Sequence, residues 1–210
     1  MEAYRGTVNT KWFDYGQTEI DYLSSADETL GEAMRRMGKI ERVVMPDLFT
    51  AIVYAIVGQL ISVKAVDTIW ERMQARLGEI TPSNILRKNE VDIQACGMTM
   101  KKAIYIKNIA QTVAHDGFQL EELHELPDEE VIKKLTALSG VGKWTAEMLL
   151  MNGMERPDVV SWGDIAIRRG MMKLYGLSTL DKEQFEYYRQ KYSPYGSVAS
   201  IYLWAISFET

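Results

Sequence analysis

The stretch Leu138-Ser139-Gly140-Val141-Gly142-Lys143-Trp144-Thr145-Ala146 has the pattern of one helix ending, a tight turn and a second helix beginning. Gly140 and Gly142 accept positive φ without strain, and their missing Cβ lets another surface approach the backbone. The outward amides of such a turn form a site for an anion, and a DNA phosphate fits it. Two glycines that only end a helix would need no ligand. A nucleotide P-loop fits poorly, because Ala137 and Trp144 break its pattern.

The rest of the chain has helical periodicity and no convincing alternating strand pattern. Its five prolines stand beside helical stretches, where a missing N–H does least harm. The expected helices cover residues 26–37, 47–77 with a break near Gly58, 83–87, 90–95, 101–115, 128–138, 143–151, 165–175, 182–191 and 196–207. We therefore expect an all-α fold, with residues 1–25 as an irregular N-terminal arm and residues 26–210 as a helical core.

The composition indicates an ordinary folded protein. Of its 210 residues, 47% are hydrophobic and 25% are charged. The single Cys96 excludes an intramolecular disulfide and a zinc or iron–sulfur site built on several thiolates. His115 and His124 are expected at the surface. The apolar run 49–60 is too short to span a membrane, and the N-terminus lacks the apolar core of a signal peptide, so we expect a cytoplasmic protein.

Two features remain open from composition and local sequence alone. The net charge of −5 argues mildly against nucleic acid as a partner, unless basic side chains gather on one side of the molecule. Farther along, Trp162-Gly163-Asp164 ends a loop and precedes an amphipathic helix. Asp164 is a favoured N-cap residue and needs no chemistry to explain it. Asp158, directly after Pro157, is the second carboxylate of this loop.

The hairpin together with the downstream Asp164 resembles the helix-hairpin-helix superfamily of DNA glycosylases, named for that hairpin and a Gly/Pro-rich loop ending in Asp. The resemblance covers residues 26–206. It implies two helical lobes with an active-site cleft between them and the hairpin at residues 128–151. It also implies an enzyme that flips a damaged base out of duplex DNA. Asp164 would then be the catalytic carboxylate, stabilising positive charge on the deoxyribose and orienting the attacking water.

Trp144 narrows the expected reaction. In family members that also cut the strand, a lysine at this position forms a Schiff base with the sugar, which an indole cannot do. Lys143 lies about 100° around the helix and should face elsewhere. The string Gly142–Ala146 most resembles the 3-methyladenine DNA glycosylase II branch, which removes N-alkylated purines. The resemblance therefore implies a glycosylase without lyase activity, acting in base excision repair and leaving an abasic site.

Such cationic bases suit an aromatic pocket, through stacking and cation–π attraction. The candidates for its lining are Trp144, Trp162, Tyr202 and Trp204, each with core packing as the alternative. Trp204 is best placed by resemblance, since the segment 194–204 is similar to the C-terminal helix of that branch.

Several residues are candidates for contact with DNA. By resemblance Met100 is the wedge that fills the gap left by the flipped base. The other candidates are Gly140, Gly142, Lys143 and Thr145 of the hairpin, with Lys101 and Lys102 beside the wedge. Arg168 and Arg169 are more simply a solvated helix face. Gln59 is expected to make a structural hydrogen bond.

No cofactor is expected to be required. The resemblance implies a potassium or sodium ion at the hairpin, held by the backbone carbonyls of Thr136, Leu138 and Val141. The expected partner is double-stranded DNA with a damaged base, without a membrane, and the protein is expected to be a monomer.

Three departures and two alternatives accompany this interpretation. The chain has no room for the β-rich N-terminal domain of longer members, Ser139 stands where proline is common, and Ile165 stands where an aromatic can follow the catalytic Asp. One alternative is a glycosylase for an oxidised or mismatched base. The other is a non-catalytic helix-hairpin-helix module that binds DNA.

Overall fold

A computed structural model describes residues 9–115 and 117–209 of the chain. These residues form twelve α-helices, one 3₁₀ helix and two very short strands. The prediction of an all-α fold is confirmed. No helix within the two described ranges has the length and apolar character needed to cross a membrane. The chain divides into two compact units, which are described separately.

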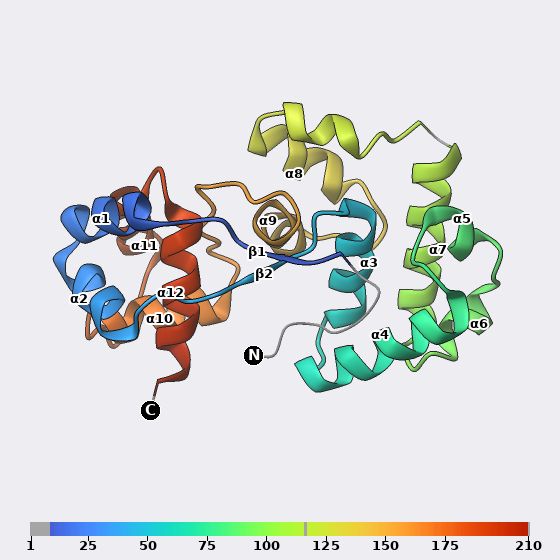
Figure 1. Cartoon of the computed structure of the whole chain (residues 1–210), viewed down its shortest axis with the longest axis horizontal. Coiled ribbons are helices and arrows are strands. Elements are labelled where there is room, and N and C mark those ends of the chain that lie inside the picture. The colour runs from blue at the N-terminus through green and yellow to red at the C-terminus, as the bar shows by residue number, and fades with distance from the viewer. Residues whose placement is uncertain (1–8, 116, 210) are drawn as a thin grey trace. The chain divides into compact units, whose positions relative to one another are not determined.

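The first, here called the hairpin unit, contains Met45–Met154 and the start of the described chain up to Lys11. Its helices are α3 (Leu48–Gly58), α4 (Val63–Leu77), α5 (Pro82–Leu86), α6 (Glu90–Gln94), α7 (Met100–His115), η1 (Glu121–Glu125), α8 (Asp128–Thr136) and α9 (Lys143–Asn152). Helix α3 is almost entirely apolar and packs against α4, α7 and α9, while α5 and α6 pack on α7 (Figure 1). The core of this unit therefore forms around α3.

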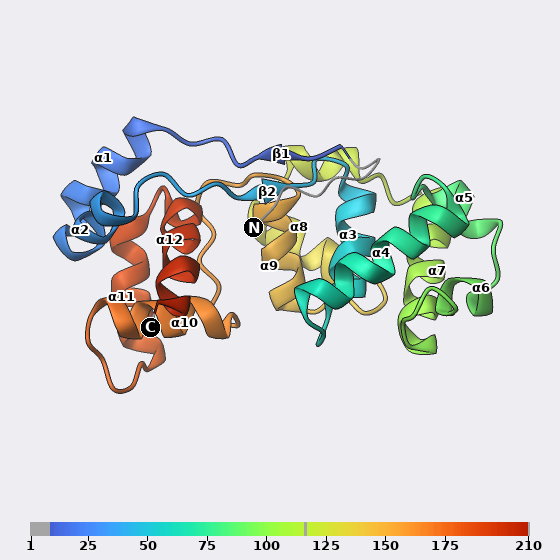
Figure 2. The same ribbon diagram turned by 60° about the horizontal axis from the view of Figure 1, so that its bottom comes forward.

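The second, here called the aspartate unit, is built from two separate segments, Trp12–Val44 and Glu155–Thr210. Its elements are α1 (Gln17–Ala26), α2 (Glu28–Met37), β2 (Val43–Val44), α10 (Ile165–Leu174), α11 (Lys182–Tyr192) and α12 (Gly196–Phe208), and β2 pairs with β1 (Lys11–Trp12). The apolar α12 crosses α10 in close contact, as Figure 2 shows. A Cβ on Gly170 would lie 1.9 Å from the carbonyl oxygen of Leu203, so only glycine permits this approach.

The prediction of an irregular arm over residues 1–25 is wrong from residue 17 onward, because Gln17–Ala26 forms α1. The carboxylate of Glu19 accepts a hydrogen bond from the Gly16 amide at 2.7 Å, which caps the helix, and Leu23 anchors it in the core. A single fully buried leucine in ten residues gives too weak a periodicity to recognise. Residues 1–8 lie outside the described part of the chain.

The other expected helices are present, and no end is displaced by more than two residues. The predicted break near Gly58 is confirmed: α3 ends there, and the hydroxyl of Ser62 accepts from the Ala65 amide to start α4. The helix expected from Ala26 begins instead after Asp27, whose carboxylate accepts from the Leu30 amide at 2.9 Å.

Candidate nucleic-acid interface and active-site carboxylate

The predicted hairpin connects α8 to α9. Gly140 adopts φ +80°, and the amide of Val141 donates to the carbonyl of Leu138 at 3.1 Å. Gly142 is the N-cap of α9 and has no side chain with which to cap the helix. A Cβ on Gly142 would meet no described atom within 4 Å. The N-cap of α9 therefore has open space beside it, which leaves room for an anion.

Gly140 packs directly on Tyr105 of α7. A Cβ on Gly140 would lie 2.2 Å from the Tyr105 ring, so both the positive φ and the close contact require glycine here. The same ring carries the ammonium group of Lys101 at 5.7 Å from its centroid. Tyr105 thus brings an exposed lysine next to the hairpin turn.

The turn between α3 and α4 presents Leu60, which sequence reasoning missed. Leu60 is fully exposed and adopts φ +60°, a left-handed conformation that is uncommon for a leucine. Its neighbours Ile61 and Val63 are also exposed. Strained backbone and an exposed apolar side chain at one position indicate a functional site. The available signal in the sequence was a helix break with apolar residues on both sides of Gln59.

Gln59 connects this turn to the hairpin. Its amide nitrogen donates to the Gly140 carbonyl at 2.9 Å and to the Thr145 hydroxyl at 3.3 Å. The structural hydrogen bond expected of Gln59 is therefore confirmed. Gln59 is the C-cap residue of α3. Thr145 is 4% exposed over the whole residue, so neither its hydroxyl nor its backbone amide offers much surface to a phosphate.

Lys102 has a different role from the one expected. Its ammonium group donates to the carbonyls of Val57 at 2.8 Å and Gln59 at 2.7 Å, the last carbonyls of α3. Burial lowers the pKa of this lysine. The predicted phosphate contact of Lys102 is wrong, because its donors point at the protein's own backbone.

The two methionines of the preceding loop differ in exposure. Met98 is buried, whereas Met100, the first residue of α7, is 38% exposed. Met100 therefore remains the candidate wedge of this pair, beside the exposed Lys101.

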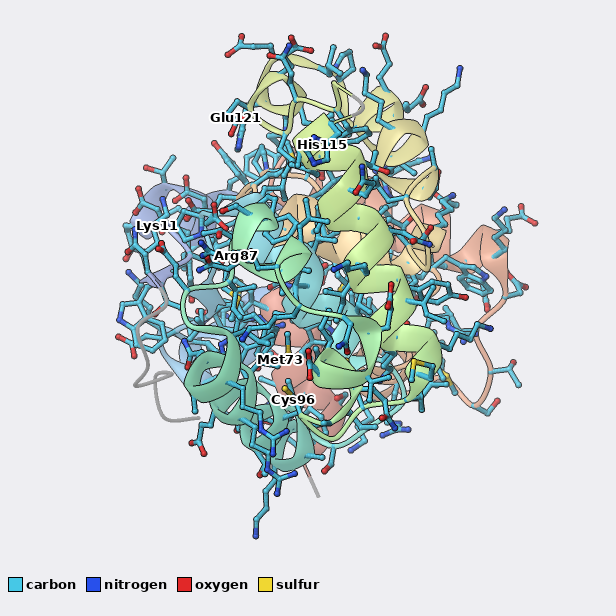
Figure 3. All side chains as sticks on the ribbon, turned by 90° about the vertical axis from the view of Figure 1, so that its right-hand side faces the viewer. Lys11, Met73, Arg87, Cys96, His115 and Glu121 are labelled. Atoms are coloured by element: carbon cyan, nitrogen blue, oxygen red, sulfur yellow. The ribbon has the colours of Figure 1, made fainter. Side chains whose placement is uncertain are left out.

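The single cysteine, Cys96, precedes this loop and is a buried free thiol, and His115 is the last residue of α7 (Figure 3). Both histidines are exposed, as expected.

The start of α9 exposes two predicted site residues. The Trp144 side chain is an exposed large hydrophobic, at 43%. The side chain of Lys143 is 77% exposed and lies 3.8 Å from the carboxylate of Glu147, one turn along the helix. Such surface pairs contribute roughly 0.5 kcal/mol, so Lys143 can exchange this partner for another anion.

Asp164 belongs to the aspartate unit and is the N-cap of α10. Asp164 is 6% exposed over the whole residue, and its Oδ1 accepts from the amides of Ala166 at 2.8 Å and Ile167 at 3.0 Å. The positive end of the α10 dipole favours negative charge at this position. Asp158 is used differently: it accepts from the Ser193 hydroxyl and the Gly196 amide at the start of α12.

The aromatic candidates of the aspartate unit differ in burial and in the groups that contact them. Tyr202 is fully buried and donates to the Gly38 carbonyl at 2.9 Å, so the expectation that it lines a pocket is wrong. A tyrosine on an apolar helix has the same periodicity as a pocket residue, and only packing distinguishes them. Trp204 is half-buried and has the guanidinium of Arg42 4.2 Å from its ring centroid.

Trp162 is held on two sides. Phe185 meets it edge-on at 5.2 Å between ring centroids, and the guanidinium of Arg168 lies 4.8 Å from its centroid. The expectation that Arg168 is solvated is wrong, since its Nε is buried without a hydrogen-bond partner among the described residues. Arg169 is exposed, as expected.

An ion at the hairpin would rest on carbonyl oxygens. No group of three or more His, Cys, Asp or Glu side chains suited to a metal occurs in the described ranges. Thr136 ends α8, where the last carbonyls lack helical partners and the helix dipole favours a cation. The Leu138 carbonyl accepts from the Val141 amide at 3.1 Å. The ion expected at the carbonyls of Thr136, Leu138 and Val141 stays a prediction.

An open glycine turn between two helices, seated on α7 and followed downstream by a buried capping aspartate, defines the helix-hairpin-helix class of DNA-binding proteins. Comparison with known sequences agrees: residues 53–194 match the model of the HhH-GPD superfamily base excision DNA repair proteins. The chain belongs to this family.

Among its relatives, DNA-3-methyladenine glycosylase 1 of Schizosaccharomyces pombe is 27% identical over 194 residues, covering 89% of this chain and 85% of that protein. A DNA-3-methyladenine glycosidase structure from Bacillus halodurans superposes with a TM-score of 0.83 at 30% identity, covering 94% of this chain and 93% of that one. A 3-methyladenine DNA glycosylase of S. pombe in complex with abasic DNA gives a TM-score of 0.79 at 27% identity, covering 90% and 95%.

Proposed function

We propose that this protein is a monofunctional DNA glycosylase that excises alkylated purines of the 3-methyladenine type from duplex DNA and leaves an abasic site. The observation that carries the proposal is Asp164, a buried carboxylate capping α10 in a chain of the base excision repair family. Relatives named for 3-methyladenine support the substrate class. One chain serves one lesion, so we propose a monomer.

The chemistry asked of Asp164 is charge stabilisation. Departure of the base leaves an oxocarbenium-like positive charge on the deoxyribose, and an anion fixed nearby lowers the energy of that state. The amides of Ala166 and Ile167 orient the carboxylate before the substrate arrives. Water then attacks the sugar, with the same carboxylate as its orienting acceptor. Departure of an alkylated purine needs little acid help because the base is already cationic.

The protein is proposed not to cleave the DNA strand, because Trp144 stands at the hairpin position where a lyase needs a nucleophile. A lyase needs a nucleophilic amine at this position of the hairpin, and an indole has none. Lys143, one residue earlier, extends into solvent towards Glu147.

DNA is proposed to bind along the exposed segments of the hairpin unit. The open amides at Gly142 grip a phosphate, and Lys101 and Lys143 supply positive charge. We assign the wedge to Leu60, which is more exposed than Met100, the residue indicated by resemblance. This placement answers the charge objection, since backbone amides replace surplus basic side chains. Potassium or sodium bound to the hairpin carbonyls would favour the turn that holds these amides.

Trp144 of the hairpin unit and Trp204 of the aspartate unit are each proposed, within its own unit, as an aromatic surface for the damaged base. Each exposes indole surface, and the Trp204 ring already has a cation, the Arg42 guanidinium, in contact. Trp162 is a weaker candidate because Phe185 and Arg168 already contact it.

A panel of duplexes tests the proposal. Methylated DNA and duplexes with hypoxanthine, ethenoadenine or 8-oxoguanine are each incubated with the protein and scored for free base and strand nicking. We expect release of alkylpurines, with nicking only after alkali or heat. Nicking without treatment contradicts the Trp144 argument. Release of only the oxidised base favours the other-lesion alternative. DNA binding without any release favours a non-catalytic module.

A further inference from the structure

The Leu60 turn needs support that its own sequence does not supply. A leucine at φ +60° costs about 1 kcal/mol or more, and such conformations persist only where the surroundings hold them. The side chain itself contributes nothing to that support, because it is fully exposed. Other residues must therefore fix the backbone on which it stands.

Lys102 contacts the backbone that leads directly into the bend. Its ammonium group donates to the carbonyl of Val57 at 2.8 Å and to that of Gln59, the residue directly before Leu60, at 2.7 Å. These carbonyls lie at the C-terminal end of α3, where the helix dipole favours a cation. Gln59 in turn donates to the Gly140 carbonyl at 2.9 Å, which joins the turn to the hairpin.

We propose that Lys102 is a positioning residue for base flipping: it fixes the Leu60 turn at one height and orientation relative to the hairpin that grips the phosphate. The proposal rests on the proposed function, since it needs a duplex into which Leu60 is inserted. Lys102 acts through Leu60 and does not contact DNA. This differs from the role of the adjacent Lys101, whose side chain is exposed.

A double-mutant cycle tests this assignment. The variants are Lys102→Met, Leu60→Ala and the double substitution, with Lys102→Arg as the conservative replacement. Insertion is followed by 2-aminopurine fluorescence opposite a stable abasic site, which needs no catalysis, and base release is followed under single-turnover conditions.

We expect Lys102→Met to reduce insertion and base release about fivefold to tenfold, and to have no further effect in the Leu60→Ala background. Lys102→Arg should restore most of the loss, because a guanidinium can still donate to both carbonyls. The salt dependence of duplex binding should not change, since no phosphate contact is removed.

Lys107→Met is the matched control. Lys107 lies in the same helix, and its ammonium group donates to the carbonyls of Ile85, Leu86 and Lys88 at the end of α5, away from the Leu60 turn. It should lower thermal stability without a specific loss of insertion. If Lys107→Met and Lys102→Met reduce insertion equally, or if the two effects of the cycle are additive, the positioning role is overturned.

Two further outcomes distinguish the positioning role of Lys102 from a phosphate contact and from failure of the proposed function. A shallower salt dependence in Lys102→Met would show a phosphate contact and overturn the proposal. If the wild-type protein inserts into the abasic duplex but releases no base, the proposed function fails while the positioning role is still measured by fluorescence. If Lys102→Met does not fold, Lys102→Gln, which keeps a neutral donor group, enters the cycle in its place.

Discussion

The two units place their functional groups in opposite ways. The hairpin unit exposes Leu60 on the turn after α3 and Trp144 in the first turn of α9. Side chains that donate to backbone carbonyls hold the Leu60 turn and the glycine turn. The aspartate unit buries Asp164 and holds it with backbone amides of its own helix. A surface that inserts into DNA must protrude, whereas a charge that acts on a sugar gains strength from being shielded. The proposed function therefore uses exposed side chains in the hairpin unit and a buried one in the aspartate unit.

The largest effect is expected at Asp164. Asp164→Asn removes the negative charge but keeps a good N-cap, so we expect a loss of base release of about a thousandfold with little change in stability. Single-turnover release and thermal unfolding measure the two quantities. Binding to an abasic duplex should be preserved. Retained base release in this variant would remove Asp164 from the chemistry.

The next effect is on stability, at the hairpin glycines. Gly140→Ala should destabilise the protein by roughly 2 kcal/mol or more, because the new Cβ meets Tyr105 and the backbone has positive φ. Gly142→Ala is the paired control, since a Cβ there meets no described atom within 4 Å. Urea unfolding of both variants tests the difference. Equal losses would contradict the packing of the turn on α7.

The two candidate wedges, Leu60 and Met100, should differ in how much base release is lost when each is truncated, because they differ in exposure. Leu60→Ala is expected to reduce base release about tenfold without lowering stability, because its side chain is fully exposed. Met100→Ala should reduce it less. Single-turnover rates on one alkylated duplex decide between them, and a larger loss for Met100→Ala would return the wedge to α7.

The smallest effect concerns Arg42, which occupies cation-binding surface of Trp204. Arg42→Met should raise the ratio of 7-methylguanine release to hypoxanthine release about threefold, because a cationic base no longer competes with the guanidinium. Arg36→Met is the control, since that arginine pairs with Glu209 at the surface. An unchanged ratio would exclude Trp204 as a cation-accepting wall.

The sequence predicted local features well and long-range partners poorly. Helix periodicity, the break at Gly58 and the glycine turn depend on neighbours within a few residues, and the structure contains them. Lys101 and Lys102 are the same residue type in adjacent positions, yet only the second reaches Val57, 45 residues away. Likewise nothing in the spacing of Tyr202 shows that its hydroxyl bonds to Gly38. Such contacts arise from packing, which periodicity does not encode.

The discontinuous aspartate unit has a consequence for synthesis on the ribosome. Helices α1 and α2 emerge first, yet α10, α11 and α12, with which they form one unit, follow only after the whole of Met45–Met154. The hairpin unit has its long segment available earlier and can fold while the nascent chain is still growing. The unit that carries Asp164 is thus completed last, so a chain that stops short of α12 can form the glycine turn before the aspartate unit is finished.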